Sequence, residues 1–299
     1  MRNLALRIAL CATLAGCAHA PEKSAPVAPS VNTPPAAPSG PQANDNLNAV
    51  AWTQTAIEHD LIYREVFRNA GEKLSLALKD RSWDALPKTE RTKPGVAKLK
   101  PAVIVDIDET VLDNSPYQAR RIRDGKEFDE FSWSEWCREK AARPLPGALE
   151  FAQGAAKRGV TVFYLSNRAQ DLNEATLDNL RSAGFPIASN ENVFLGLGTV
   201  VEGCEQVGTE KGCRRELIGR KYRVLMQFGD QIGDFVDVLA NTADGRRAAI
   251  EPYAGWIGER WFVLPNPTYG SWEPALFNND WTQPLPARRK AKIDSLKVN

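Results

Sequence analysis

Histidine is scarce in this chain of 299 residues: only His19 and His59 are present, both within the first fifth. A histidine phosphatase, a Ser-His-Asp hydrolase and a metal centre built from several histidines all need more imidazoles than this. The chain also has no excess of basic residues, because its formal net charge is +1. We therefore expect no nucleic-acid polymer among its partners, since such proteins carry a broad positive patch.

Long apolar runs are missing as well. The apolar stretch at residues 4–14 follows Arg2 and is too short to span a bilayer, which is typical of a signal peptide. It ends in "LAGC", which resembles the lipobox of bacterial lipoproteins. We predict a signal peptide over residues 1–16, a lipid on Cys17, and anchoring in the bacterial cell envelope, at the outer membrane. A plain secretory signal is the alternative.

The region after the signal peptide has no aromatic residue and is rich in proline, alanine and serine. Proline fixes φ and removes a backbone donor, so such a segment favours an extended, unfolded chain. We predict that residues 17–46 comprise the lipidated cysteine and a disordered tether. A folded domain is expected over residues 47–285, followed by a basic C-terminal tail over residues 286–299.

Three cysteines remain beyond the tether: Cys137, Cys204 and Cys213. Their spacing does not match a zinc site. Export to an oxidising compartment would permit a disulfide, and Cys204 and Cys213 flank a turn-rich loop. Sequence alone leaves open whether these two cysteines pair, because it does not give their geometry.

Helical and strand patterns alternate along the folded part, separated by short links. This alternation predicts an α/β fold with a mainly parallel sheet and helices on both faces. In such sheets, ligands bind beyond the carboxyl ends of the strands. The expected helices cover residues 48–78, 147–158, 171–183, 211–219 and 232–239, and the expected strands cover residues 102–105, 160–165, 192–195, 222–228 and 260–264.

Polar side chains follow three of these strands directly, so they should meet at one edge of the sheet. Two unit charges about 5 Å apart repel by roughly 3 kcal/mol at an effective dielectric constant near 20. A hard divalent cation offsets this repulsion, and Mg²⁺ commonly binds through a few carboxylates together with a substrate phosphate. A solvated acidic turn would explain "DID" alone, but not this convergence. The residues are Asp106 and Asp108 after the first strand, Ser166, Asn167 and Arg168 after the second, and Asp230 and Asp234 after the third.

Two carboxylates two residues apart can also divide the chemistry of phosphate transfer. One can attack phosphorus and form an aspartyl-phosphate, and the other can protonate the leaving oxygen and later activate water. The pair, the serine and the "GDQIGD" segment each follow a predicted strand, so a solvated acidic turn is not a sufficient explanation.

The segments "DIDET", "LSNR", the lysine of "EKGCRR" and "GDQIGD" resemble the four motifs of the haloacid dehalogenase (HAD) superfamily. The stretches "NAVAWTQTA", "RPLPGALEF" and "LPNPTYGSWE" further resemble its class C acid phosphatases, of the lipoprotein e(P4) type. The similarity covers nearly all of residues 47–275. It implies a HAD-like Rossmannoid three-layer sandwich with an N-terminal helical segment and small cap elements. It also implies a Mg²⁺-dependent acid phosphatase acting on phosphomonoesters, above all nucleoside 5′-monophosphates.

The resemblance assigns roles to the catalytic residues. Asp106 is the expected nucleophile and Asp108 the acid/base, while Ser166 is expected to hydrogen-bond the phosphoryl oxygens. Lys211 matches the family's lysine, which stabilises charge on the transferring group. The family usually has serine after that lysine, whereas this chain has Gly212, so Lys221 stays as an alternative.

The resemblance also implies metal and substrate contacts. The Mg²⁺ ligands would be Asp106, Asp230 and the backbone carbonyl of Asp108, with Asp234 binding directly or through water. Trp133 and Tyr269 are expected to enclose a nucleobase or another flat leaving group, or else only to pack the core. The remaining expected contacts to the phosphate and its surroundings are Asn114, Asn167 and Arg168.

Other interpretations keep the same residues but change their use. A phosphotransferase of the superfamily would pass the phosphoryl group to an alcohol from the same site. A surface binding lipoprotein on an inactive phosphatase scaffold is a different class. Plant storage proteins of this type have lost a catalytic aspartate, but this chain keeps both Asp106 and Asp108. A homodimer is a further expectation.

Overall fold

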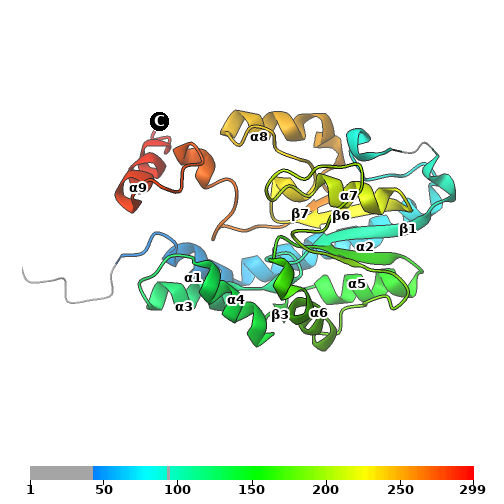
Figure 1. Cartoon of the computed structure of the whole chain (residues 1–299), viewed down its shortest axis with the longest axis horizontal. Helices are drawn as coiled ribbons and strands as arrows, with labels where there is room; N and C mark the ends of the chain where they lie inside the picture. The colour runs from blue at the N-terminus through cyan, green and yellow to red at the C-terminus, as the bar shows by residue number, and fades with distance from the viewer. Residues whose placement is uncertain (1–42, 93–94) are drawn as a thin grey trace, which may run out of the picture. The chain divides into compact units, whose positions relative to one another are not determined.

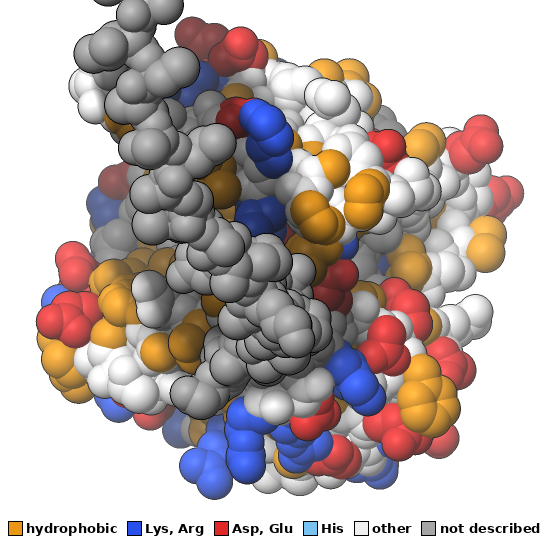
Figure 2. Space-filling view, turned by 90° about the vertical axis from the view of Figure 1, so that its left-hand side faces the viewer, with side chains coloured by type: hydrophobic (Ala, Val, Ile, Leu, Met, Phe, Trp, Pro, Cys, Tyr) orange, Lys and Arg blue, Asp and Glu red, His pale blue; other side chains and the backbone are white. Residues whose placement is uncertain are grey.

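The structure is a computed structural model that describes residues 43–92 and 95–299. The predicted signal peptide, the predicted lipidation site Cys17 and most of the predicted tether lie outside these residues. Within the described part of the chain, no helix is both long and apolar enough to cross a membrane. The face of the molecule in Figure 2 carries side chains of both charge signs as well as hydrophobic ones.

A five-stranded sheet, in the order β5–β4–β1–β6–β7, forms the centre, and every neighbouring pair is parallel. In the middle strand, Val103 lies opposite Val162 on one side and Met226 on the other. This arrangement confirms the predicted mainly parallel sheet. The strands are β1 (Lys100–Asp106), β4 (Thr161–Leu165), β5 (Phe194–Leu195), β6 (Tyr222–Gly229) and β7 (Trp261–Val263).

Helices cover both faces of this sheet (Figure 1). On one side lie α2 (Ile57–Lys79), α5 (Ala148–Lys157) and α6 (Asn173–Ser182), and α2 packs against α5. On the other side lie α7 (Gly212–Gly219) and α8 (Ala243–Ile250). The predicted three-layer α/β sandwich is therefore confirmed.

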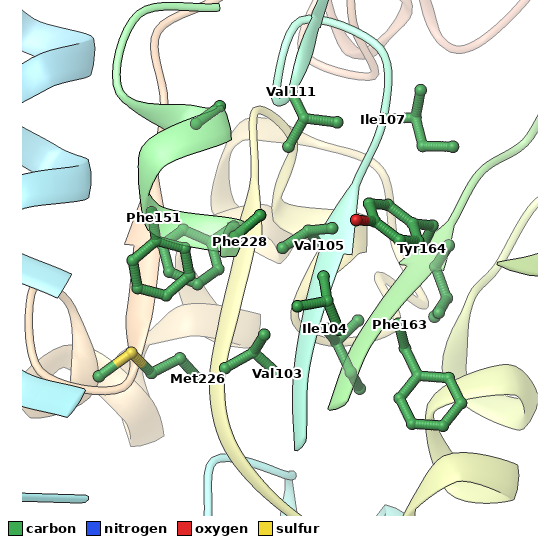
Figure 3. Packing of buried hydrophobic residues seen from close by; sticks show 14 of the residues in the cluster. Val103, Ile104, Val105, Ile107, Val111, Phe151, Phe163, Tyr164, Met226 and Phe228 are labelled. Carbon is green, nitrogen blue, oxygen red and sulfur yellow. The ribbon is translucent and has the colours of Figure 1, made fainter. Parts of the chain in front are cut away.

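The core lies where β1 passes between its neighbours. Residues 102–105 of β1 are buried, as the continuous apolar run predicts for a strand covered on both faces. Figure 3 shows Phe151 of α5 beside Phe228 of β6, with their ring centroids 4.6 Å apart. Phe67 of α2 stacks on the same Phe228 ring. Truncating a buried aromatic side chain such as Phe228 to alanine costs about 3–5 kcal/mol, so this packing holds β1 and β6, and the residues that follow them, in place.

A small cap is inserted between β1 and α5, as the family resemblance implies. It consists of α3 (Ser115–Arg123), α4 (Glu130–Glu139) and the antiparallel pair of β2 (Leu112–Asp113) with β3 (Arg143–Pro144). Asp129 begins α4 as its N-cap, because its carboxylate accepts a hydrogen bond from the Ser132 backbone N–H at 2.9 Å.

Two predicted helices differ from the structure. The helix expected over residues 48–78 is divided at Ala56, whose ψ of 122° is extended, into α1 (Leu47–Thr55) and α2. The helix expected over residues 232–239 is wrong, since only a 3-10 turn forms at Ile232–Asp234. The reason is tertiary, because Asp234 pairs with Lys211 and Asp237 accepts from the Gly212 backbone N–H, and both partners belong to a distant segment.

The basic C-terminal stretch forms a helix, α9 (Leu285–Asp294). The buried Arg288 side chain pairs with Glu127 at 2.9 Å, and its guanidinium lies 5.3 Å from the centre of the Trp281 ring. Further 3-10 turns cover Lys88–Glu90, Val96–Lys98, Gln170–Leu172, Glu251–Trp256 and Pro274–Phe277.

Candidate active site

The predicted site lies at the carboxyl edge of the sheet. Asp106 is the last residue of β1, Ser166 directly follows β4, and Asp230 directly follows β6. Because these three strands are parallel neighbours, their ends deliver the side chains to one place. The predicted convergence of polar groups is therefore what the fold produces.

Three carboxylates gather at this edge. One oxygen from each of Asp106, Asp230 and Asp234 lies within 4.8 Å of the others. Burial, followed by repulsion from Asp234, raises the pKa of Asp230 to about 7. Burial also raises the pKa of Asp106 well above its ordinary value, although Lys211 opposes that shift. A compact set of hard oxygen donors fits a divalent cation such as Mg²⁺.

Lys211 is the cation nearest to this cluster. Its Nζ donates to Asp106, to Asp234 Oδ1 at 2.7 Å and to the Leu165 carbonyl at 3.1 Å. Burial alone would lower the pKa of Lys211, but the carboxylates of Asp106 and Asp234 have the larger effect and raise it. The alternative, Lys221, keeps 68% of its side chain exposed and lies 3.9 Å from Glu191. The structure therefore brings Lys211, and not Lys221, to the acidic cluster.

The carboxylate of Asp108 lies apart from that cluster and faces Arg168. Arg168 donates to Asp108 Oδ1 through Nε at 3.0 Å and Nη2 at 2.7 Å. The Ser166 hydroxyl donates to Asp108 Oδ2 at 3.3 Å, and the Asn114 amide donates to Oδ1 at 2.9 Å. The arginine that sequence assigned to the substrate thus pairs with the predicted acid/base in this structure.

The two predicted asparagines are also engaged by protein groups. Asn114 is fully buried, and its Oδ1 accepts from Trp136 Nε1 at 2.8 Å. Asn167 Oδ1 accepts from Arg214 Nη2 at 2.7 Å. Both side chains therefore hold the loops around the site in position.

The two predicted aromatic residues come from segments that follow motif one in the chain. The Arg168 guanidinium lies 5.5 Å from the centre of the Trp133 ring, within reach of a cation–π contact. The Tyr269 hydroxyl donates to the carboxylate of Glu109. Tyr269 thus contacts motif one directly, whereas Trp133 is linked to it through Arg168, which pairs with Asp108.

Glu109 belongs to the site and was given no role from sequence. It is 4% exposed and has a left-handed φ of 55°. Its carboxylate accepts from the Asn114 backbone N–H at 2.8 Å, and its carbonyl accepts from the Tyr63 hydroxyl at 2.5 Å. Burial and then the nearby Asp108 raise the pKa of Glu109 well above its ordinary value. The only sequence signal was its place as the third acid of "DIDET".

Asn266 and Gln231 were also missed. Asn266 Nδ2 donates to Asp230 Oδ2 at 2.7 Å, and Gln231 Nε2 donates to the same oxygen at 2.8 Å. These hydrogen bonds orient a predicted metal ligand. Asn266 lies in the stretch "LPNPTYGSWE", which resembles the family but did not single out this asparagine as a site residue.

The structure answers the question about the cysteines, because Cys204 and Cys213 form a disulfide. Cys213 is the second residue of α7 and lies two positions after Lys211. Cys137 is free and buried in α4.

Comparison with known proteins identifies the family. Residues 50–272 match the family described as HAD superfamily, subfamily IIIB (acid phosphatase). The chain belongs to this family. The solved structure of the class C acid phosphatase from Bacillus anthracis superposes with a TM-score of 0.72 at 31% identity, covering 85% of this chain and 97% of that one. A second structure of that enzyme contains bound tungstate.

Known plant relatives are more distant. Acid phosphatase 1 of Solanum lycopersicum is 26% identical over 166 residues, which is 56% of this chain and 57% of the relative. Vegetative storage protein 2 of Arabidopsis thaliana is 28% identical over 167 residues, or 56% and 55% of the two chains. The chain thus spans little more than half the length of these two relatives. The relatives of this chain include both a named phosphatase and a storage protein, so catalysis must be argued from the residues of this site.

Proposed function

We propose that this protein is a Mg²⁺-dependent acid phosphatase that hydrolyses small phosphomonoesters through an aspartyl-phosphate. The observation that carries the proposal is the meeting of Lys211 with Asp106 and Asp234, beside Asp230, at the carboxyl edge of the sheet. An inactive scaffold would have no need for a buried lysine and three buried or half-buried acids in one place, because each charge is costly to bury alone.

The first step requires Asp106 as a carboxylate. Its oxygen attacks phosphorus, the bond from phosphorus to the ester oxygen breaks, and Asp108 gives a proton to that leaving oxygen. Asp108 then takes a proton from water, the water oxygen attacks phosphorus, and the bond to Asp106 breaks. Inorganic phosphate and the alcohol are the products. Arg168, Ser166 and Asn114 hold the Asp108 side chain for both proton transfers.

Positive charge must balance the phosphoryl group during both steps. Lys211 supplies one charge from the protein. Asp106, Asp230, Asp234 and the carbonyl of Asp108 would hold a Mg²⁺ ion, which would supply further charge and orient the phosphate when bound.

Nucleoside 5′-monophosphates are the substrates that we propose. Tyr269 contacts Glu109 of motif one, and Trp133 is linked to Asp108 through Arg168; both aromatic rings are only partly buried. Stacking of a base on an aromatic ring contributes about 1–3 kcal/mol and tolerates different bases. Removal of the phosphate would give a neutral nucleoside that the cell can import.

We also propose that a lipid on Cys17 anchors the enzyme in the bacterial envelope. The sequence order of basic residues, short apolar run and "LAGC" supports this. A Cys17→Ala variant should lose both metabolic labelling by an alkyne fatty acid and its place in the membrane fraction. Retained labelling would exclude this anchor.

The central experiment measures phosphate release from adenosine 5′-monophosphate and from p-nitrophenyl phosphate, with Mg²⁺ and after EDTA. Asp106→Asn should lower kcat at least ~10³-fold, and Asp108→Asn by about 10²–10⁴-fold, since they remove the nucleophile and the proton donor. Asp113→Asn is the matched control, because that carboxylate accepts from the Ser115 backbone N–H at 2.8 Å and lies in the same segment. Equal turnover in Asp106→Asn and its parent would refute the mechanism.

A further inference from the structure

The first residue of α7 has an unusual neighbour. Gly212 follows Lys211, and its backbone N–H donates to Asp237 Oδ1 at 3.0 Å. A β-carbon at position 212 would lie 2.1 Å from Asp237 Oδ2 and 2.8 Å from Asp237 Cγ. The φ of Gly212 is not positive, so this glycine is required for space and not for backbone conformation. The carboxylate of Asp237 fills the volume that a side chain at position 212 would occupy.

Asp237 also connects α7 to the loop that carries the metal ligands. Its Oδ1 accepts from Arg215 Nη2 at 2.8 Å, one turn along α7. The same fully buried guanidinium donates to the Gly233 carbonyl at 2.8 Å, next to Asp234. Burial alone would lower the pKa of Arg215. The carboxylates of Glu90 and then Asp237 raise that pKa by more, so the arginine stays ionised.

These contacts fix the position of Lys211 at the start of α7. Lys211 is the N-cap of α7, and the residue after it is the one that Asp237 holds. The lysine Nζ must reach Asp106, Asp234 and the Leu165 carbonyl at once. A shift of α7 relative to the loop after β6 would separate Nζ from at least one of these acceptors.

We propose that Asp237 is a positioning residue for Lys211, because its carboxylate holds the first turn of α7 in the space beside Gly212. The inference rests on the proposed function, since it assigns Asp237 to the phosphate-stabilising part of the same site. It also accounts for glycine at position 212, because the Asp237 carboxylate leaves no room there for a β-carbon.

A double-mutant cycle tests this dependence. The variants are Gly212→Ala, Asp237→Ala and the two combined, each assayed with Mg²⁺ at least ~15 °C below its own melting temperature. The measured quantities are kcat and KM for p-nitrophenyl phosphate and the inhibition constant of tungstate, an oxyanion probe of the phosphate position. Each single variant should lower kcat and weaken tungstate inhibition about tenfold. In the double variant, kcat and tungstate inhibition should also fall only about tenfold, because the new methyl group enters space that the carboxylate has left. Two independent sites would instead give a combined loss of ~100-fold.

Glu90→Gln is the matched control. Glu90 is the other acidic partner of Arg215, with Oε1 at 2.6 Å from Nη2, but it makes no hydrogen bond to Gly212 among the described residues. It should lower the melting temperature while leaving the tungstate inhibition constant within twofold of the parent. Additive losses in the double variant, or an equal tungstate effect in Glu90→Gln and Asp237→Ala, would overturn the inference. A parent protein without phosphatase activity would instead refute the proposed function itself.

Discussion

The affinity of the free protein for Mg²⁺ should fall steeply between pH 7 and pH 5, because Asp230 must lose its proton to bind the ion. Burial and the charge of Asp234 raise the pKa of Asp230 from 3.8 to about 7. A carboxyl group with that pKa is about half ionised at pH 7 and about 1% ionised at pH 5. Competition by this one proton should therefore weaken Mg²⁺ binding about 50-fold over that range.

Isothermal titration calorimetry of metal-free protein at pH 5, 6 and 7 measures this dependence directly. Asp230→Asn should bind Mg²⁺ weakly and with a much smaller pH slope, because an amide does not titrate. Asp113→Asn should keep the parent's slope, since its carboxylate accepts from the Ser115 backbone N–H and is not one of the three clustered acids. Equal affinity at pH 5 and pH 7, or a parent-like slope in Asp230→Asn, would refute the argument.

The same shift has a consequence for stability. The folded pKa of Asp230 lies above the ordinary value of 3.8, so the proton favours the folded state. Metal-free protein should thus lose stability as the pH rises from about 4 to about 7, by an amount on the order of 4 kcal/mol from this group. Mg²⁺ should restore that stability at pH 7 and have little effect at pH 4, as melting temperatures with and without the ion would show.

Three further predictions follow from single contacts. Lys211→Met should lower kcat about 10²–10³-fold through lost charge stabilisation, with a circular dichroism spectrum like the parent's; a loss below threefold would contradict its role. Cys204→Ser should lower the free energy of unfolding by about 2–3 kcal/mol, since the Cys204–Cys213 bridge spans nine positions, and an unchanged urea midpoint under non-reducing conditions would argue against that estimate. Arg168→Lys, which removes the fork on Asp108, should lower kcat about tenfold for adenosine 5′-monophosphate but less for p-nitrophenyl phosphate, whose leaving group needs less protonation. Equal losses on both substrates would show that Arg168 acts elsewhere.

The sheet and its acidic edge could be predicted because local signals and global fold agree there. Residues 102–105 form a continuous apolar run, and a parallel sheet buries such a run on both faces. The acids come directly after it, so their place at the carboxyl edge follows from strand direction alone. The cap was implied by resemblance only. Its helix α3 has three arginines in its last turn, and two of its three buried residues, Ser115 and Arg121, are polar or charged. Apolar spacing therefore gives little signal for this helix.

Contacts between distant segments could not be predicted in the same way. The expected helix over residues 232–239 fails because Asp234 and Asp237 are each bound by groups from α7 or its N-cap. The apolar spacing within residues 232–239 cannot predict these hydrogen-bond and ion-pair partners, because they lie in a different segment. Arg168 was assigned to substrate for the same reason, since a sequence shows an arginine near the site but not the carboxylate that it faces.

The charge balance of the site explains why these partners exist. Asp106, Asp108, Glu109, Asp230 and Asp234 would carry five negative charges if all were ionised, against the positive charges of Lys211 and Arg168. Burial, together with this excess of negative charge, raises the pKa of Asp106, Glu109 and Asp230. A divalent cation would relieve it without protonation and would leave the carboxylates ionised for chemistry. We therefore expect metal binding, proton release and folding to be linked in this protein, and the calorimetric pH series would measure that linkage directly.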